Sequence, residues 1–167
     1  MPSSTPSAAD TQGLLRLDNQ LCFALYAASL AMTKLYKPLL DRLGLTYPQY
    51  LVMLVLWEHG GQTVSELGER LFLDSGTLTP LLKRLQSAGW VVRRRDTTDE
   101  RRVIVHLTPA GEALREAAVQ VPLEVACATH CSLEEIAELR QRLHGLRQRL
   151  SLRTTYPAPA SAKRRAA

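Results

Sequence analysis

The stretch TVSELGERLFLDSGTLTPLLKRLQSAGWVVRRRDTTDERRVIVHL, residues 63–107, decides the fold. Thr63 and Glu66 have the spacing of a capping box, which predicts that a helix begins there. A short turn then leads to a second helix that either Asp74 or Ser75 can cap, because these side chains accept hydrogen bonds from the first free amides of a helix. The stretch therefore predicts two helices joined by a tight turn.

Two alternating segments follow the second helix and predict a β-hairpin. Residues 90–95 and 101–107 alternate in polarity, and five polar residues connect them. Exposed hairpin arginines fit a narrow minor groove, and short hydroxyls at a helix start followed by cations fit the major groove. The alternative is a solvated hairpin whose charges only prevent edge pairing. The candidate DNA-binding residues are Asp74, Ser75, Thr77, Thr79, Lys83, Arg84, Arg93, Arg94, Arg95, Asp99, Arg101 and Arg102.

The two helices and the hairpin resemble the MarR family of winged-helix repressors. The hairpin carries the Asp-x-x-Asp-x-Arg pattern of that family, formed by Asp96, Asp99 and Arg101. The resemblance implies that the hairpin is a wing, in which Asp99 orients Arg101 and Arg101 enters the minor groove. We expect a mainly α-helical fold with a small β-hairpin wing, a winged helix-turn-helix that dimerises through its N- and C-terminal helices.

Length and composition fit one globular domain. The chain has 167 residues, of which 46% are hydrophobic and 22% charged, with a net charge of +5. The positive excess lies in the hairpin and the C-terminal tail, which is consistent with nucleic-acid binding. The sequence shows no apolar run of about 18 residues and no signal peptide. We therefore expect a cytoplasmic protein that contacts no membrane and keeps its three cysteines reduced.

The sequence predicts long helices on both sides of the DNA-binding lobe, which we place at residues 47–107. Apolar residues step by threes and fours from Leu14 to Leu43, which predicts one helix of about eight turns, kinked or interrupted at Pro38. This apolar face is longer than a small domain needs, so we expect a two-fold dimer. The predicted organisation is a disordered lead (1–13), dimerisation helices (14–46 and 108–152), a DNA-binding lobe (47–107) and a disordered basic tail (153–167).

Cys22 lies beside this apolar face and is the candidate reactive group. Tyr26 is four residues on and shares its face. Tyr36 is 14 residues on, about 21 Å along a helix, so it can approach Cys22 only from a second chain, where Tyr47 could join it. Phenol hydroxyls near the sulfur would stabilise the thiolate, the form that attacks a peroxide. A buried inert cysteine is the alternative.

Cys22 with these tyrosines is similar to the organic hydroperoxide sensors within the MarR family. The resemblance covers roughly residues 14–150 and implies a repressor whose reactive cysteine is oxidised by organic hydroperoxides. It also implies that Tyr36 and Tyr47 hydrogen-bond the reactive sulfur across the subunit boundary. In one branch a second cysteine in the C-terminal half resolves the oxidised sulfur, and Cys127 matches its position.

The C-terminal cysteines leave alternatives open. Cys131 could replace Cys127 as the resolving residue or take no part, and both could be structural. Together with His130 they make a poor zinc set, because a closed zinc site needs four ligands. We expect no metal and no cofactor.

The expected function is that of a redox-sensing transcriptional repressor. A reduced homodimer binds a palindromic double-stranded operator, and an organic hydroperoxide releases it by oxidising Cys22, after which an intersubunit disulfide forms. One alternative is a repressor released by a non-covalent phenolic ligand. A weaker alternative is a thiol peroxidase using Cys22 and Cys127, although no Cys-x-x-Cys motif and no basic residue beside Cys22 favours an enzyme.

Overall fold

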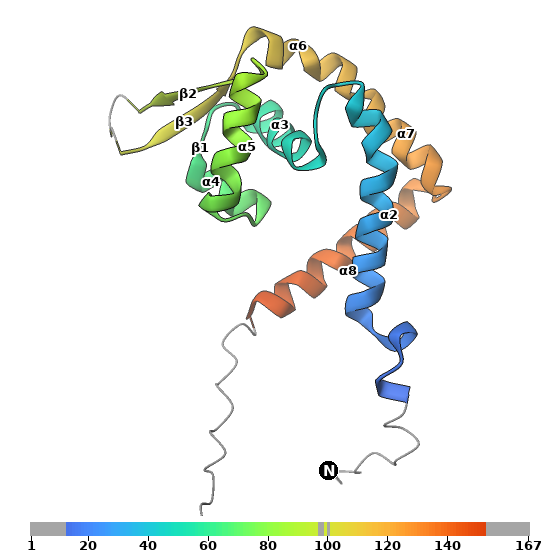
Figure 1. Cartoon of the computed structure of the whole chain (residues 1–167). Helices are drawn as coiled ribbons and strands as arrows, with labels where there is room; N and C mark the ends of the chain where they lie inside the picture. Colours follow the sequence, from blue (N-terminus) through green and yellow to red (C-terminus); the bar gives the residue numbers. More distant parts are fainter. Residues whose placement is uncertain (1–12, 97–98, 100, 153–167) are drawn as a thin grey trace, which may run out of the picture. The chain divides into compact units, whose positions relative to one another are not determined.

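The computed structural model describes residues 13–96, 99 and 101–152 (Figure 1). Residues 1–12 of the expected lead, and the whole of the expected tail at 153–167, lie outside the described residues. Contacts divide the chain into two compact units, Met1–Val125 and Ala126–Ala167. The elements in chain order are η1 (Leu17–Asn19), α2 (Leu21–Asp41), α3 (Tyr47–His59), β1 (Gln62–Thr63), α4 (Val64–Leu71), α5 (Ser75–Ser87), β2 (Val91–Arg95), β3 (Val103–Leu107), α6 (Pro109–Ala118), α7 (Gln120–Thr129) and α8 (Leu133–Leu152).

The fold is mainly helical with one small antiparallel sheet, so the predicted fold class is confirmed. Strand β3 lies between β1 and β2, and the β2–β3 hairpin extends away from the helices (Figure 1). Thr63 pairs with Ile104, and Val91 pairs with Leu107 at the base of the hairpin. The sequence did not predict β1, because two residues are too short to show alternation.

Helix α3 forms the buried centre of the first unit. Thr46 and Gln49 form a capping box at its start, with the Thr46 amide donating to the Gln49 side chain over 2.8 Å. Most of its apolar side chains are buried against other elements, and Leu54 is exposed. The core that they form includes Tyr50, Val52, Met53, Leu56 and Trp57 of α3, Leu67 of α4, and Leu78, Leu82 and Leu85 of α5.

Gly111 connects α6 to α3 and to the start of β2. The Trp57 indole N–H donates to the Gly111 carbonyl oxygen over 2.9 Å. The Gly111 amide donates to the Thr108 hydroxyl over 3.0 Å, which caps α6. A methyl group at Gly111 would lie 2.0 Å from the Trp90 carbonyl oxygen. Only a residue without a side chain lets α6 approach the backbone this closely.

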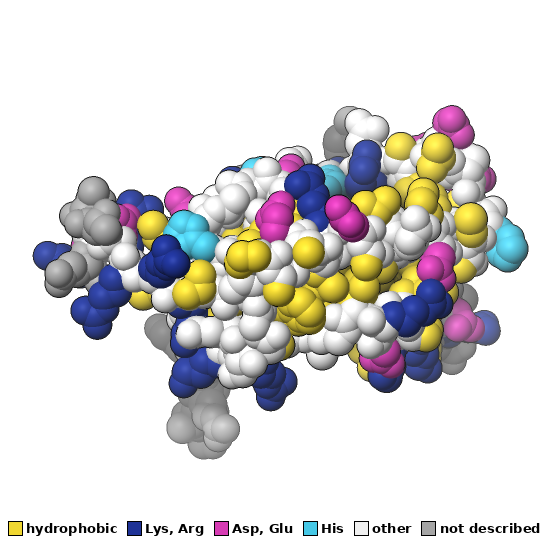
Figure 2. Space-filling view, turned by 90° about the horizontal axis from the view of Figure 1, so that it is seen from above, with side chains coloured by type: hydrophobic (Ala, Val, Ile, Leu, Met, Phe, Trp, Pro, Cys, Tyr) yellow, Lys and Arg dark blue, Asp and Glu magenta, His cyan; other side chains and the backbone are white. Residues whose placement is uncertain are grey.

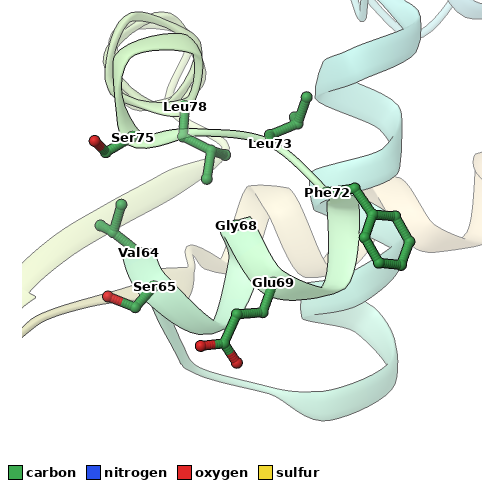
Figure 3. Close-up of a pocket in the computed structure, with 8 residues that line it drawn as sticks. All are labelled: Val64, Ser65, Gly68, Glu69, Phe72, Leu73, Ser75 and Leu78. Carbon is green, nitrogen blue, oxygen red and sulfur yellow. The ribbon is translucent and has the colours of Figure 1, made fainter. Parts of the chain in front are cut away.

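The helices of the reading head, which we define as α4, α5, β2 and β3, begin at the predicted caps. Thr63 caps α4, with its hydroxyl accepting from the Glu66 amide over 3.2 Å. Asp74, rather than Ser75, caps α5. Leu78, in the first turn of α5, points toward α4 (Figure 3), and Phe72 ends α4 in the left-handed conformation.

The prediction of one long first helix beginning at Leu14 is wrong, because the helical segment breaks at η1 and α2 begins only at Leu21. The Asn19 side chain donates to the Gly13 carbonyl over 2.7 Å, and the Gln20 side chain donates to the Leu14 carbonyl. These local bonds occupy backbone acceptors that a continuous helix would use. The apolar spacing was correct, but polar side chains next to it ended the helix.

Two prolines inside the terminal helices have different effects. Helix α2 runs through Pro38 without interruption. Thr108 and Pro109 have the pattern of a cap and first helical residue, and the sequence predicts one helix from there to about His130. The structure has two helices instead, with α6 ending at Ala118 and α7 beginning at Gln120. Pro122 has no amide hydrogen for the Ala118 carbonyl, four residues back, and its ring crowds that carbonyl. The helical ladder therefore breaks there.

We expect Gly111→Ala to lower the free energy of unfolding by about 3 kcal/mol, since the added methyl group must push α6 off the Trp90 carbonyl. Urea denaturation measures the change. Gly145→Ala in α8 is the control, because the methyl group there meets only the end of the Arg149 side chain, at 3.5 Å. It should be neutral or stabilising by up to about 1 kcal/mol. Equal effects at both glycines would contradict the role given to Gly111.

Candidate nucleic-acid interface and thiol site

The first turn of α5 presents polar side chains that are already ordered by the helix cap. The Asp74 carboxylate accepts from the Thr77 amide and from the Thr77 hydroxyl, each over 2.9 Å. These two bonds hold the pKa of Asp74 below its usual value. The Thr79 hydroxyl donates to the Ser75 carbonyl over 2.7 Å. Because each of these two exposed hydroxyls already donates a hydrogen bond within the protein, each can act toward a ligand only as an acceptor.

The wing turn is shaped by Asp99 through the backbone. Its side chain accepts from the Arg101 amide over 3.1 Å, and its carbonyl accepts from the Arg102 amide over 2.9 Å. The Asp96 amide donates to the Arg102 carbonyl over 2.9 Å and continues the hairpin. The family resemblance implied that Asp99 orients Arg101. The contact in this chain is between the Asp99 side chain and the Arg101 main-chain amide, so Asp99 fixes the backbone of Arg101.

Two of the predicted DNA-binding arginines contact other parts of the reading head. Arg93 donates from Nε to the Gln86 side chain in the last turn of α5, over 2.6 Å. Arg102 lies 3.7 Å from the Glu66 carboxylate on α4. Lys and Arg side chains lie beside the wing, among others elsewhere on this face (Figure 2). The other predicted cations, all exposed, are Lys83, Arg84, Arg94, Arg95 and Arg101.

Three tyrosines pack together where α2 meets α3. The ring centroids of Tyr36 and Tyr47 are 4.9 Å apart, and those of Tyr36 and Tyr50 are 6.1 Å apart. Burial, and next to it the neighbouring Tyr47, raises the pKa of Tyr36. Burial also raises the pKa of Tyr50 to about 12. The sequence singled out Tyr36 and Tyr47 but missed Tyr50 as a member, although it follows Tyr47 by about one helical turn.

The three cysteines carry free, exposed thiols. Cys22 and Tyr26 lie in the first turns of α2, while Tyr36 lies toward the other end of the same helix. The phenol cluster is therefore not beside Cys22 of its own chain. Cys127 lies on α7, and Cys131, just before α8, donates from its thiol to the Thr129 carbonyl over 3.4 Å.

Within the part of the chain that the structure describes, no group of three or more His, Cys, Asp or Glu side chains is placed to hold a metal ion. Among the same residues, no helix combines the length and the apolar character needed to cross a membrane.

Comparison with known proteins places this architecture in a family. The family described as transcriptional regulator SarA/Rot matches residues 34–117. The organic hydroperoxide resistance transcriptional regulator of Bacillus subtilis (strain 168) is 50% identical over 136 residues, covering 81% of this chain and 92% of that protein. The structure of reduced AbfR bound to DNA is 40% identical with a TM-score of 0.71, covering 84% of this chain and 96% of that one. The structure of disulfide-formed AbfR is also 40% identical, with a TM-score of 0.59, covering 84% of this chain and 98% of that one.

The helix-turn-helix, the wing and these likenesses define a winged-helix, DNA-binding transcription regulator. Wild-type MarR from E. coli shares the fold at 27% identity and a TM-score of 0.63, covering 76% of this chain and 96% of that one. The chain belongs to the MarR family, and within it resembles the Bacillus subtilis organic hydroperoxide regulator. The resemblance predicted from the sequence is confirmed.

We expect Tyr50 to be the last tyrosine to ionise as the pH rises. Because its folded-state pKa of about 12 exceeds the ordinary value of 10.0, the stability it contributes is complete below pH 10 and is lost as the pH rises toward 12. A tyrosinate absorbance titration should lose its latest step in Tyr50→Phe and keep it in Tyr26→Phe. Loss of that step in Tyr26→Phe instead would contradict the assignment.

Proposed function

We propose that the chain is a redox-sensing transcriptional repressor, which binds a palindromic operator when reduced and leaves it when an organic hydroperoxide oxidises Cys22. The observation that carries the proposal is a thiol at the start of an apolar helix that no described residue of the chain covers, on a DNA-reading fold. The relationship to the Bacillus subtilis regulator and to AbfR, described in reduced, DNA-bound and disulfide forms, supports it.

A homodimer accounts for the exposed apolar side chains of the terminal helices. Helix α2 has 21 residues, yet only Leu39 and Leu40 are buried. Helix α8 has no buried residue among those the structure describes. An apolar surface of this extent favours a second copy of the chain as its cover. The exposed apolar residues of the two helices include Leu21, Phe23, Tyr26, Leu30 and Met32 on α2, and Leu133, Leu139, Leu143 and Leu150 on α8.

In such a dimer, we propose that Cys22 meets phenols of the other copy. If two α2 helices lie antiparallel, the first turns of one face the last turns of the other, where Tyr36 and Tyr47 pack together. Their hydroxyls can then donate to the Cys22 sulfur and stabilise its thiolate. The apolar surroundings would favour an alkyl or lipid hydroperoxide over hydrogen peroxide. Tyr26 lies one helical turn after Cys22 on the same face of α2, so its ring can contact the Cys22 side chain.

The chemistry that we propose has two steps. The Cys22 thiolate attacks the outer oxygen of the hydroperoxide, the O–O bond breaks, and the alkoxide leaves and takes up a proton as the alcohol. Sulfur is oxidised by two electrons to the sulfenic acid. The Cys127 thiolate of the other subunit then attacks this sulfur, forming the S–S bond and releasing hydroxide, which is protonated to water.

Disulfide formation moves the helices that carry the reading heads. A disulfide requires α-carbons within about 7 Å, so the terminal helices must shift if the thiols begin farther apart. Helix α7 carries Cys127 and also Glu124, whose carboxylate accepts two hydrogen bonds from Arg42 just beyond α2, over 3.1 and 3.2 Å. This pair passes a displacement of α7 to the end of α2. The two α5 helices of the dimer, which must lie about 34 Å apart to enter successive major grooves, then no longer have that spacing.

We expect Cys22→Ser to bind the operator as the wild type does but to ignore cumene hydroperoxide, because serine cannot form a sulfenic acid. Electrophoretic mobility shift with increasing peroxide measures the difference. Release of Cys22→Ser at the wild-type dose would remove the redox proposal. Peroxide consumption by the wild type should stop at about one equivalent per subunit, whereas continued turnover would identify a thiol peroxidase.

Cys127→Ala should lose the covalent dimer on non-reducing gels after peroxide treatment, while Cys131→Ala should retain it. The reason is that Cys127 lies on the regular part of α7, whereas Cys131 lies in the connection to α8. The two variants are matched controls for each other. The opposite pattern would assign the resolving role to Cys131.

A second candidate function is supported by a cleft beside Tyr47. The cleft has a volume of 330 Å³ and lies between α2 and the start of α3, with Leu30, Leu45 and Pro48 among its apolar lining residues. A small phenolic ligand there could release DNA without covalent chemistry. Reversible release of Cys22→Ser by such a ligand would favour this function over peroxide sensing.

A further inference from the structure

The cleft between α4 and the wing contains an ion pair that the sequence does not indicate. Arg102, in the wing turn just before β3, lies 3.7 Å from the Glu66 carboxylate, and both side chains line the cleft together with Arg101. Arg102 was predicted as a DNA contact. Its position toward α4 instead gives it a partner within the protein.

Glu66 is held in place before it meets Arg102. One carboxylate oxygen, Oε2, accepts from the Thr63 amide over 2.7 Å and from the Thr63 hydroxyl over 2.8 Å. The other oxygen, Oε1, is the one that faces Arg102. Because the capping box has already ordered the glutamate, pairing with Arg102 requires the ordering of only one more side chain.

A backbone pairing next to the ion pair also joins the start of α4 to β3. Thr63 belongs to β1 and pairs with Ile104 of β3, two residues beyond Arg102. The start of α4 therefore contacts β3 and the residue just before it at two points. One is the pairing of Thr63 with Ile104, and the other is the ion pair between Glu66 and Arg102. Both partners are about half exposed, so the pair adds little to stability. Its effect is on the direction of the wing relative to α4 and α5.

We propose that Glu66 is a positioning residue for DNA binding, which acts through Arg102 to hold the wing at the angle that lets Arg101 reach the minor groove. Arg102 is then a part of the wing support and not an independent phosphate contact. This inference rests on the proposed DNA-binding function of the reading head.

The test uses the full-length reduced protein and a fluorescent duplex that the wild type selects from a random-sequence library. Glu66→Gln keeps the capping box, since glutamine can replace glutamate in it, and removes only the charge that faces Arg102. Glu69→Gln is the matched control, because it removes the same charge from the same helix and cleft without breaking an observed ion pair.

The two possible roles of Arg102 predict opposite changes in DNA affinity when Glu66 is replaced by glutamine. If Glu66 supports the wing, Glu66→Gln should bind DNA about two- to fivefold more weakly, while Glu69→Gln should not weaken binding. If Arg102 contacts phosphate independently, removing the negative charge of Glu66 frees a cation and tightens binding. Unchanged or tighter binding by Glu66→Gln would overturn the proposal.

Two further readouts separate positioning from a general structural effect. A plot of the logarithm of the DNA association constant against the logarithm of the salt concentration has a negative slope. The magnitude of this slope should decrease by up to about 0.9 in Glu66→Gln although no cation has been removed, because Arg101 no longer contacts the DNA. Thermal unfolding midpoints should match the wild type. In a double-mutant cycle, Glu66→Gln with Arg102→Ala should bind no more weakly than Arg102→Ala alone, and additive losses would contradict the coupling.

A failure of the wild type to select any duplex would refute the proposed DNA-binding function itself. A selected duplex that binds Glu66→Gln as well as the wild type would refute only the role of Glu66. The two failures are therefore distinguishable.

Discussion

The contact between Gly111 and the Trp90 carbonyl is the constraint on which the rest of the structure depends. Helix α6 lies against the backbone where β2, the first wing strand, begins, which is possible because Gly111 carries no side chain. The Trp57 indole then fixes the Gly111 carbonyl to the central helix. One residue thus joins the core helix, the wing and the first C-terminal helix, so a shift of α6 must also move the elements that face DNA.

Several polar side chains in the reading head serve two purposes at once. Asp74 caps α5 and also accepts a hydrogen bond from the Thr77 hydroxyl, which leaves the oxygen of that hydroxyl free to act as an acceptor. Asp99 closes the wing turn through main-chain amides. Such short-range bonds order the side chains before any ligand arrives, which lowers the entropic cost of binding. Surfaces that recognise DNA are thus prepared by the same bonds that begin helices and turns.

The sequence predicted what depends on neighbours in the chain and missed what depends on distant ones. The caps at Thr63 and Asp74 and the hairpin were recognisable because their partners lie within four residues or alternate regularly. The break between α6 and α7 was missed, although Pro122, four residues beyond Ala118, was a signal for it. The partners of Arg93 and Arg102 could not be predicted, since Gln86 and Glu66 meet them only after the chain has folded. The third tyrosine of the cluster was hidden among the core residues of α3.

The buried residues of the described chain all come before Ala126. Proteins fold from the N-terminus as they are synthesised, so the reading head can complete its core while the last helix is still emerging from the ribosome. Helix α8 is the last helix that the structure describes, and none of its described side chains is buried. The order of synthesis therefore completes the core of the reading head before the exposed apolar side chains of α8 are made.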